Sequence, residues 1–148
     1  MALLEGKVAV ITGASRGIGK SIAQRFVQEG ATVAFTYRSS DEKARELEAE
    51  LTAAGGTARG FKSNAGSLAE SELLIANVVE AFGTVDILVN NAGITRDTLL
   101  MRMSEQQWDE IMEVNLKSCF NLTKGVMRTM LRARAGSIIN MSSVVGIT

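Results

Sequence analysis

The feature that most constrains the fold is the regular alternation of short apolar runs with longer amphipathic segments along the chain. The run "KVAVIT" is almost continuously apolar and meets a glycine turn, as a strand buried on both faces of a sheet does. Strands are expected at residues 7–12, 31–37, 57–63, 85–93 and 137–143, and helices at 17–29, 39–54, 68–82 and 104–134. This alternation predicts one α/β domain over residues 1–148, a doubly wound parallel (Rossmann) sheet with strand order 3-2-1-4-5.

The helix boundaries are expected from local signals. Ser104 and Gln107 have the spacing of a capping box, so the last helix should begin there, with Trp108 as a packing anchor in its first turns. Glycines should end the helices, and Gly136 should close the last one. In the first helix, one apolar stripe should face the core, formed by Ile18, Ile22, Phe26 and Val27.

Composition excludes several function classes. Lys plus Arg and Asp plus Glu balance at 16 each, so no net charge favours nucleic acid or a membrane surface. The chain has no histidine and one cysteine, which leaves no basis for a metal site or for imidazole chemistry. Cys119 is expected to be a small core residue rather than a reactive thiol. Because no secretory signal or membrane-length apolar run is present, we expect a cytoplasmic protein.

A glycine-rich loop, "TGASRGIGKSIA", lies at the first strand–helix junction. Gly13 permits the sharp turn, Gly17 lets the backbone approach a pyrophosphate, and Gly19 lets the helix lie close to the strand. The helix N-terminus then offers free N–H groups to an anion. The residues expected to contact a dinucleotide here are Gly13, Ser15, Arg16, Gly17, Ile18 and Gly19.

The end of the second strand indicates which dinucleotide is bound. An NAD site usually has an acid there to hold the ribose hydroxyls, but this strand ends "FTYRSS" with Arg38 in that position. Arg16 adds a second guanidinium in the glycine loop. Because arginine forms bidentate charge-assisted bonds to phosphate, NADP is favoured. The alternative is that Arg38 is only a solvated surface residue.

The segments "TGASRGIG", "NNAG" and "INMSS", in that order, resemble the short-chain dehydrogenase/reductase family over the whole chain. The stretch "NNAGITRD…LLMRM" is similar to the 3-oxoacyl-[acyl-carrier-protein] reductase subgroup. The resemblance implies NADPH-dependent reduction of 3-oxoacyl-[acyl-carrier-protein] in fatty acid biosynthesis, by a homotetramer. The alternatives are a relative that acts on a sugar, polyol or steroid, and a non-catalytic NADP-binding module.

The resemblance also implies residue roles. Ser143 would hydrogen-bond the substrate carbonyl, in preference to Ser142, and Asn115 would order a proton-relay water. Around the coenzyme, the implied contacts are Asn64 and Ala65 at the adenine, and Asn91, Ala92 and Gly93 in the cleft. The family usually has Asp at position 64, so adenine recognition by Asn64 is open. The plainer interpretation is that Asn90, Asn91 and Asn115 pin loops, and that both serines simply end a strand.

The expected proton donor is missing from these residues. The family uses a tyrosine followed one helical turn later by a lysine, on a helix after the fifth strand. The only tyrosine here is Tyr37, in the second strand, and there is no histidine. We therefore expect these 148 residues to be inactive alone and to lack the family's C-terminal helix and strands, as a fragment, a cleaved product or the ordered part of a longer chain.

The last helix carries a basic stripe: Lys124, Arg128 and Arg132 recur at four-residue intervals, and Arg134 follows. These cations could simply solvate the helix end and complement its dipole. The functional alternative is a dock for acyl carrier protein, in which the resemblance points to Arg132 and Arg134.

Overall fold

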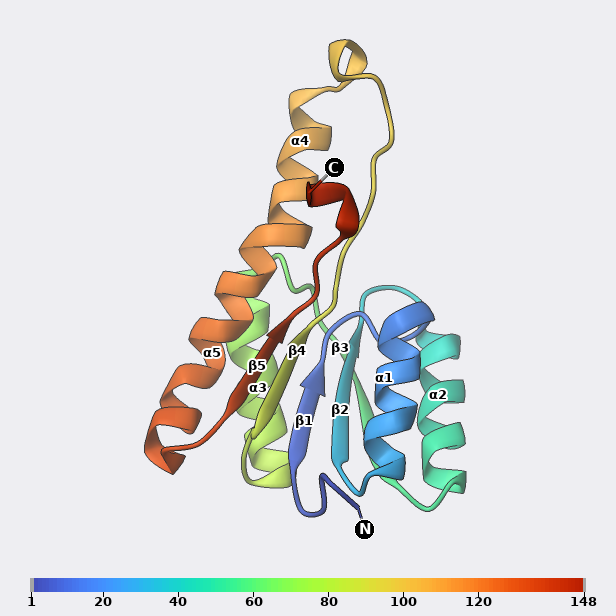
Figure 1. The fold of residues 1–148 in the computed structure, drawn as a ribbon, viewed down its shortest axis with the longest axis vertical. Coiled ribbons are helices and arrows are strands. Elements are labelled where there is room, and N and C mark those ends of the chain that lie inside the picture. Colours follow the sequence, from blue (N-terminus) through green and yellow to red (C-terminus); the bar gives the residue numbers. More distant parts are fainter. Residues whose placement is uncertain (1, 148) are drawn as a thin grey trace.

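The computed structural model describes residues 2–147 as a parallel five-stranded sheet with helices on both faces (Figure 1). The strands are β1 (Val8–Ile11), β2 (Thr32–Tyr37), β3 (Thr57–Lys62), β4 (Ile87–Asn90) and β5 (Ser137–Asn140). The α-helices are α1 (Gly17–Gln28), α2 (Asp41–Ala53), α3 (Leu68–Phe82), α4 (Glu105–Met112) and α5 (Ser118–Ala133). Three short segments, η1 (Leu100–Arg102), η2 (Glu113–Lys117) and η3 (Val144–Ile147), complete the described chain. The strand order β3-β2-β1-β4-β5 confirms the predicted doubly wound fold.

Two hydrophobic cores hold the helices on the sheet. Successive side chains of a strand point to opposite faces. Ile11 and Phe35 therefore pack with α1 and α2, while Val10 and Leu88 pack with α3 and α5. All four of these side chains are fully buried. Burial of such a side chain contributes roughly 1.5–3 kcal/mol, so the two cores fix the helices on the sheet and with them the loops at its carboxyl edge.

The long helix predicted over 104–134 is interrupted. The capping box is present, because Ser104 Oγ accepts from Gln107 N and Gln107 Oε1 accepts from Ser104 N. One π-helical turn, η2, then separates α4 from α5. A π-turn adds one residue to the helical turn and shifts the side chains that follow around the axis.

The end of α5 differs from the prediction. Arg134, at φ 52°, ends the helix in the left-handed conformation, with its N–H bonded to Leu131 O. Gly136 has a different role: a Cβ there would collide with the side chain of Met130, which packs beneath it. Glycine at 136 therefore allows close packing against Met130 and does not form the helix end.

Several predicted core positions are wrong. Ile18 is 64% exposed and Trp108 is 54% exposed, so neither anchors the core. The buried stripe of α1 instead runs through Gly19, Ala23 and Val27. Ile18 lies one residue, about 100° of rotation, away from Gly19 on that stripe. Cys119 is only half-buried, with Sγ 3.8 Å from Asn115 O.

One part of the chain projects beyond the carboxyl edge of the sheet. Figure 1 shows the loop after β4, η1 and α4 forming an arm above the sheet, with η3 beside it. In the described residues, no helix is both long and apolar enough to span a bilayer. Because the arm begins where β4 ends, it borders the loops that carry the predicted site.

Candidate functional site

The candidate site lies at the carboxyl edge of the sheet, where strand order reverses. β1 pairs with β2 on one side and β4 on the other. The connection after β1 therefore leads toward one edge of the sheet, and the connection after β4 leads toward the other edge. In open α/β sheets, such a switch point is where ligands bind. The predicted glycine loop follows β1 at this point, as the sequence indicated.

The glycine loop has the geometry of an anion cradle. Gly13 and Gly17 have φ values of +65° and +60°, which L-residues with side chains rarely adopt. A Cβ on Gly19 would lie 2.5 Å from Asn91 Nδ2 and 2.6 Å from Gly13 O, so only glycine fits beneath the loop. At the N-terminus of α1, Arg16 makes no side-chain capping bond and the first turn has no acid. The first N–H groups of α1 are therefore available to an anion.

Asn91 and Thr12 lock the loop after β4 against the glycine loop. Thr12 Oγ1 accepts from the backbone N–H of Asn91 (3.0 Å) and of Ala92 (2.9 Å). Asn91 Nδ2 donates to Thr12 O (3.1 Å) and Gly13 O (3.2 Å). In this structure Asn91 acts as a structural amide, and Thr12 is a positioning residue that sequence reasoning missed. Its only signal is its position directly before Gly13.

Thr36, the second missed residue, joins the glycine loop to β2. Its Oγ1 accepts from Gly13 N at 3.1 Å, and its carbonyl accepts from Ala14 N at 3.1 Å. The loop after β1 is thus held by the ends of both neighbouring strands. A cradle fixed in this way needs little ordering when an anion binds, which favours affinity.

The two predicted phosphate-binding cations are exposed. Arg16 lies at the N-cap of α1 and Arg38 directly follows β2. Neither forms an ion pair within residues 2–147, and the first acid after Arg38, Asp41, is paired with Lys62 instead. Both guanidinium groups are therefore free to take an anionic ligand.

The loop after β3 is held by α3 and α5. Asn64 Oδ1 accepts from Gly66 N (3.0 Å), which makes Asn64 a turn residue as well as a candidate adenine contact. Ala65 is buried, and its carbonyl accepts from Asn121 Nδ2 (2.9 Å) and Ser71 Oγ (3.4 Å). Asn121 is fully buried in α5 and was not predicted, because only the tertiary fold brings it to this loop.

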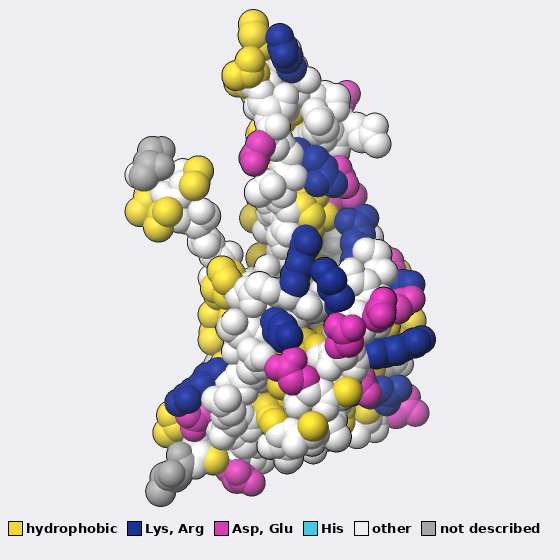
Figure 2. Space-filling model, turned by 90° about the vertical axis from the view of Figure 1, so that its right-hand side faces the viewer, with side chains coloured by type: hydrophobic (Ala, Val, Ile, Leu, Met, Phe, Trp, Pro, Cys, Tyr) yellow, Lys and Arg dark blue, Asp and Glu magenta, His cyan; other side chains and the backbone are white. Residues whose placement is uncertain are grey.

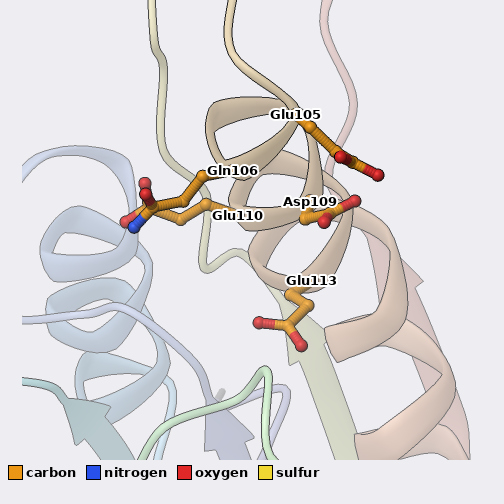
Figure 3. A pocket seen from close by; sticks show the side chains of 5 residues that line it. All are labelled: Glu105, Gln106, Asp109, Glu110 and Glu113. Atoms are coloured by element: carbon orange, nitrogen blue, oxygen red, sulfur yellow. The ribbon is translucent and has the colours of Figure 1, made fainter.

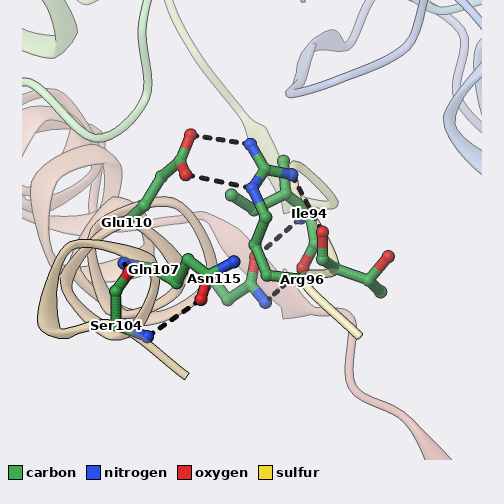
Figure 4. Close-up of polar contacts among 7 residues, drawn as sticks. Ile94, Arg96, Ser104, Gln107, Glu110 and Asn115 are labelled. Atoms are coloured by element: carbon green, nitrogen blue, oxygen red, sulfur yellow. Dashed lines mark hydrogen bonds and ion pairs between the residues drawn. The ribbon is translucent and has the colours of Figure 1, made fainter. Parts of the chain in front are cut away.

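Asn115, in the π-turn, binds the loop after β4. Its Oδ1 accepts from Ile94 N at 2.8 Å, and its Nδ2 donates to Ile94 O at 2.9 Å (Figure 4). A Cβ on Gly93 would lie 3.4 Å from Asn115 Oδ1, so the structure makes Gly93 and Asn115 neighbours. The carboxamide thus pins a loop, and the water-ordering role of Asn115 stays a prediction.

Ser142 and Ser143 lie after β5 and are exposed. Ser143 Oγ accepts from Val145 N at 3.2 Å, as in a turn. Within residues 2–147, no hydrogen bond joins Ser143 to Asn115 or to the glycine loop. The structure therefore joins the predicted residues of the glycine loop to those of the loop after β4, while Ser143 remains a separate candidate.

Away from the glycine loop, a hollow along α4 is lined mostly by acidic side chains. Figure 3 shows Glu105 and Asp109 turned to one side of the helix, and Gln106 and Glu110 to the other. Because these carboxylates diverge, they do not form a cage for a cation. Across the described part of the chain, no group of three potential ligands is placed to hold a metal ion.

Comparison with known proteins identifies the family of this chain. A family model described as short chain dehydrogenase matches residues 7–148. The chain is 50% identical over 140 residues to the 3-oxoacyl-[acyl-carrier-protein] reductase FabG of Staphylococcus aureus strain Mu50, which covers 95% of this chain and 57% of the relative. FabG of Salmonella typhimurium is 49% identical over 142 residues, covering 96% of this chain and 57% of that protein. The chain thus spans 57% of the length of these curated relatives.

A solved structure agrees with the sequence comparisons. A short-chain dehydrogenase/reductase of Serratia marcescens, determined as a double mutant, superimposes with a TM-score of 0.82 at 36% identity. The match covers 85% of this chain and 51% of the Serratia chain. The strand order, the glycine loop at the switch point and the matched relatives lead to one conclusion: the chain belongs to the short-chain dehydrogenase family.

Proposed function

We propose that the chain is the coenzyme-binding part of an NADPH-dependent 3-oxoacyl-[acyl-carrier-protein] reductase of fatty acid biosynthesis, acting in the cytoplasm. The observation that carries this proposal is the 50% identity, over 95% of the chain, to a relative named for that activity. The matched region is 57% of the length of that relative, so the proposal concerns this region of the fold. The reaction is reduction of a 3-oxo group to a hydroxyl, for which the nicotinamide supplies the hydride when bound.

The residues at the sheet edge fit a dinucleotide with a 2′-phosphate. The pyrophosphate would lie against the glycine loop and the α1 N-terminus, where no acid opposes it. Arg16 and Arg38 would bind the 2′-phosphate, since both are exposed and unpaired among the described residues. Asn64 and Ala65 would border the adenine. On the substrate side, Ser143 would donate to the carbonyl and Asn115 would hold a water.

Titration of the intact chain with NADPH and with NADH, followed by nicotinamide fluorescence, tests the coenzyme assignment. We expect NADPH to bind more tightly, and Arg38→Gln to reduce that preference while NADH binding stays unchanged. If neither coenzyme binds to folded protein, the proposed function is wrong.

We further propose that these 148 residues bind coenzyme without reducing a carbonyl. Carbonyl reduction needs a proton donor near the oxygen, and the chain has no histidine and a single tyrosine. That tyrosine, Tyr37, packs with the α1/α2 core. The test is NADPH oxidation in the presence of acetoacetyl thioester. Turnover at a normal reductase rate would overturn this part of the proposal.

Acyl carrier protein is the proposed partner, with Arg132 and Arg134 as its dock. Both side chains are exposed at the C-terminal end of α5, and neither has an ion pair within the described residues. Binding of an acidic carrier protein, measured by calorimetry, should weaken in Arg132→Glu/Arg134→Glu. The matched control is Arg45→Glu, on α2, across the sheet. Equal weakening in the control would remove the docking assignment.

A homo-oligomer is also proposed, through the outer face of α4, η2 and α5. Exposed apolar side chains follow this face: Trp108, Met112, Leu116, Phe120 and Leu131. Acids flank its first half (Glu105, Asp109) and cations its second (Lys124, Arg128). Two copies packed antiparallel about a two-fold axis would therefore bring opposite charges together.

Sedimentation velocity tests this interface. Leu116→Glu should shift the protein from dimer to monomer. Leu73→Glu, an equally exposed leucine on α3, should have no effect. A wild-type chain that stays monomeric at high concentration would exclude the interface.

A further inference from the structure

The geometry points to Lys62 as a third cation of the coenzyme site, one that increases the preference for a 2′-phosphorylated dinucleotide. This inference rests on the proposed function and deepens it, because it concerns how the site distinguishes NADPH from NADH. Lys62 carries no signal in the sequence, where it is one of six lysines and belongs to no motif. Only its position in the sheet makes it a candidate.

Lys62 lies beside the end of β2. It is the last residue of β3, and its Cα partner across the parallel ladder is Tyr37, the last residue of β2. The ladder continues one step further, because Ser63 N donates to Tyr37 O at 3.0 Å. Arg38 directly follows Tyr37 in the chain. Lys62 and Arg38 therefore leave neighbouring strands at the same edge.

The side chain of Lys62 lies on the α1/α2 face of the sheet. Along β3, Ala58 packs into the α1/α2 core, and a Cβ on Gly60 would meet Phe35 of the same core. Strand residues two apart share a face, so residue 62 shares it too. In agreement, Lys62 Nζ is 3.4 Å from Asp41 Oδ1, at the first residue of α2. The ammonium thus lies next to the short β2–α2 connection that begins with Arg38.

The ion pair to Asp41 is weak enough to be exchanged. The Lys62 and Asp41 side chains are 59% and 51% exposed, and exposed pairs contribute little because water screens them. Asp41 also has a second source of stabilisation, since it lies in the first turn of α2, where the helix dipole favours a negative charge. Lys62 can therefore turn from Asp41 to a phosphate dianion while Asp41 remains stabilised.

With Lys62 included, cations follow three adjacent strands: Arg16 after β1, Arg38 after β2 and Lys62 at the end of β3. Figure 2, which views the α1/α2 side, shows several Lys and Arg side chains gathered near mid-height with carboxylates beside them. A 2′-phosphate carries nearly two negative charges, whereas the ribose hydroxyl of NADH carries none. A third cation at this edge therefore raises affinity for NADPH specifically.

The experiment is titration of the 148-residue chain with NADPH and NADH by nicotinamide fluorescence, for wild type, Lys62→Gln and Asp41→Asn. We expect Lys62→Gln to weaken NADPH binding about three- to fivefold, the size of one partly screened charge interaction, without affecting NADH. Asp41→Asn should tighten NADPH, because it frees Lys62 and removes a carboxylate from the phosphate. The NADPH preference of wild type should also fall as salt concentration rises.

Two variants make the test specific. Lys117→Gln removes a similarly exposed lysine that pairs with Glu113 on the π-turn, and it should leave both affinities unchanged. Lys62→Arg keeps the charge and should keep the preference, which separates charge from any effect of the substitution on folding.

The outcomes distinguish a failure of this inference from a failure of the proposed function on which it rests. If wild type binds neither coenzyme, the proposed function fails and Lys62 has no role. If wild type prefers NADPH but Lys62→Gln leaves the NADPH/NADH ratio unchanged, or weakens both coenzymes equally, only the role of Lys62 is overturned.

Discussion

The carboxamide of Asn115 forms a two-bond pair with the backbone of Ile94, with Oδ1–N and Nδ2–O distances of 2.8 and 2.9 Å. Asn115 lies in the π-turn between α4 and α5, and Ile94 lies in the loop that follows β4. The pair fastens the base of the projecting arm to the helix beside it (Figure 4). Because the same loop contacts the glycine loop through Asn91 and Ala92, Asn115 helps to shape the proposed coenzyme site from a distance.

Asn115→Ala should lower the free energy of unfolding by about 1–2 kcal/mol, since two partly exposed hydrogen bonds are lost. Chemical denaturation measures this change, and hydrogen exchange should show reduced protection of the Ile94 amide. Gln106→Ala, at an exposed position of α4 with no described side-chain hydrogen bond, is the control and should be nearly neutral. Unchanged exchange at Ile94 would mean that the pair does not order the loop in solution.

Gly19→Ala should destabilise the fold by about 1–3 kcal/mol and abolish coenzyme binding, because the added methyl group overlaps Asn91 Nδ2 and Gly13 O. Thermal unfolding and NADPH titration measure the two effects. Gly146→Ala is the matched control, since a Cβ there meets nothing within 4 Å. A Gly19→Ala protein that binds NADPH normally would show that the loop and α1 can separate without loss.

Arg96 and Glu110 form a bidentate ion pair, with Nε–Oε2 and Nη2–Oε1 distances of 3.0 and 2.7 Å. This pair holds the loop after β4 to α4, at a position two residues after Ile94. Arg96→Glu and Glu110→Arg should each destabilise the protein, and the double variant should recover part of the loss. A double-mutant cycle should give a coupling of about 0.5–1 kcal/mol, as both side chains are partly exposed. Additive effects would mean that the pair contributes no net energy.

Glu50 links α2 to α1. Its bonds to Lys20, at 2.9 Å, and to Gln24 lower the pKa of the Glu50 carboxyl below its ordinary value of 4.5. A group whose pKa is lowered by folding stabilises the native state above its unfolded pKa and loses that contribution as pH falls. Stability should therefore decline below about pH 4.5, and the decline should be shallower in Glu50→Gln than in Glu46→Gln. Parallel pH profiles for the two variants would contradict the assignment.

Much of the architecture follows from local patterns. Apolar runs such as residues 7–12, followed by glycine turns, identify buried parallel strands, and chain connectivity with right-handed crossovers then restricts the strand order. The glycine loop was equally predictable, because the positive φ angles seen at Gly13 and Gly17 strongly favour glycine. The capping box of Ser104 and Gln107 was also predictable, because it depends only on two residues that lie three positions apart.

Other features depend on contacts between distant parts of the chain. The π-turn at Asn115 and the exposure of Ile18 and Trp108 depend on which elements lie beside them. The spacing of apolar residues in the sequence does not indicate these neighbours. Thr12, Thr36 and Asn121 position the site through hydrogen bonds across 23 to 80 residues, so their roles appear only once the strands and helices are assembled. The amino-acid pattern by itself determined the strands, the positions of most helices and the glycine loop, because those depend on backbone geometry and burial. Tertiary packing decided which polar side chains hold the glycine loop and that Lys62 lies on the strand beside the one Arg38 follows. Hydrogen bonds and charges act over a few ångströms in space, however far apart their residues lie in the chain.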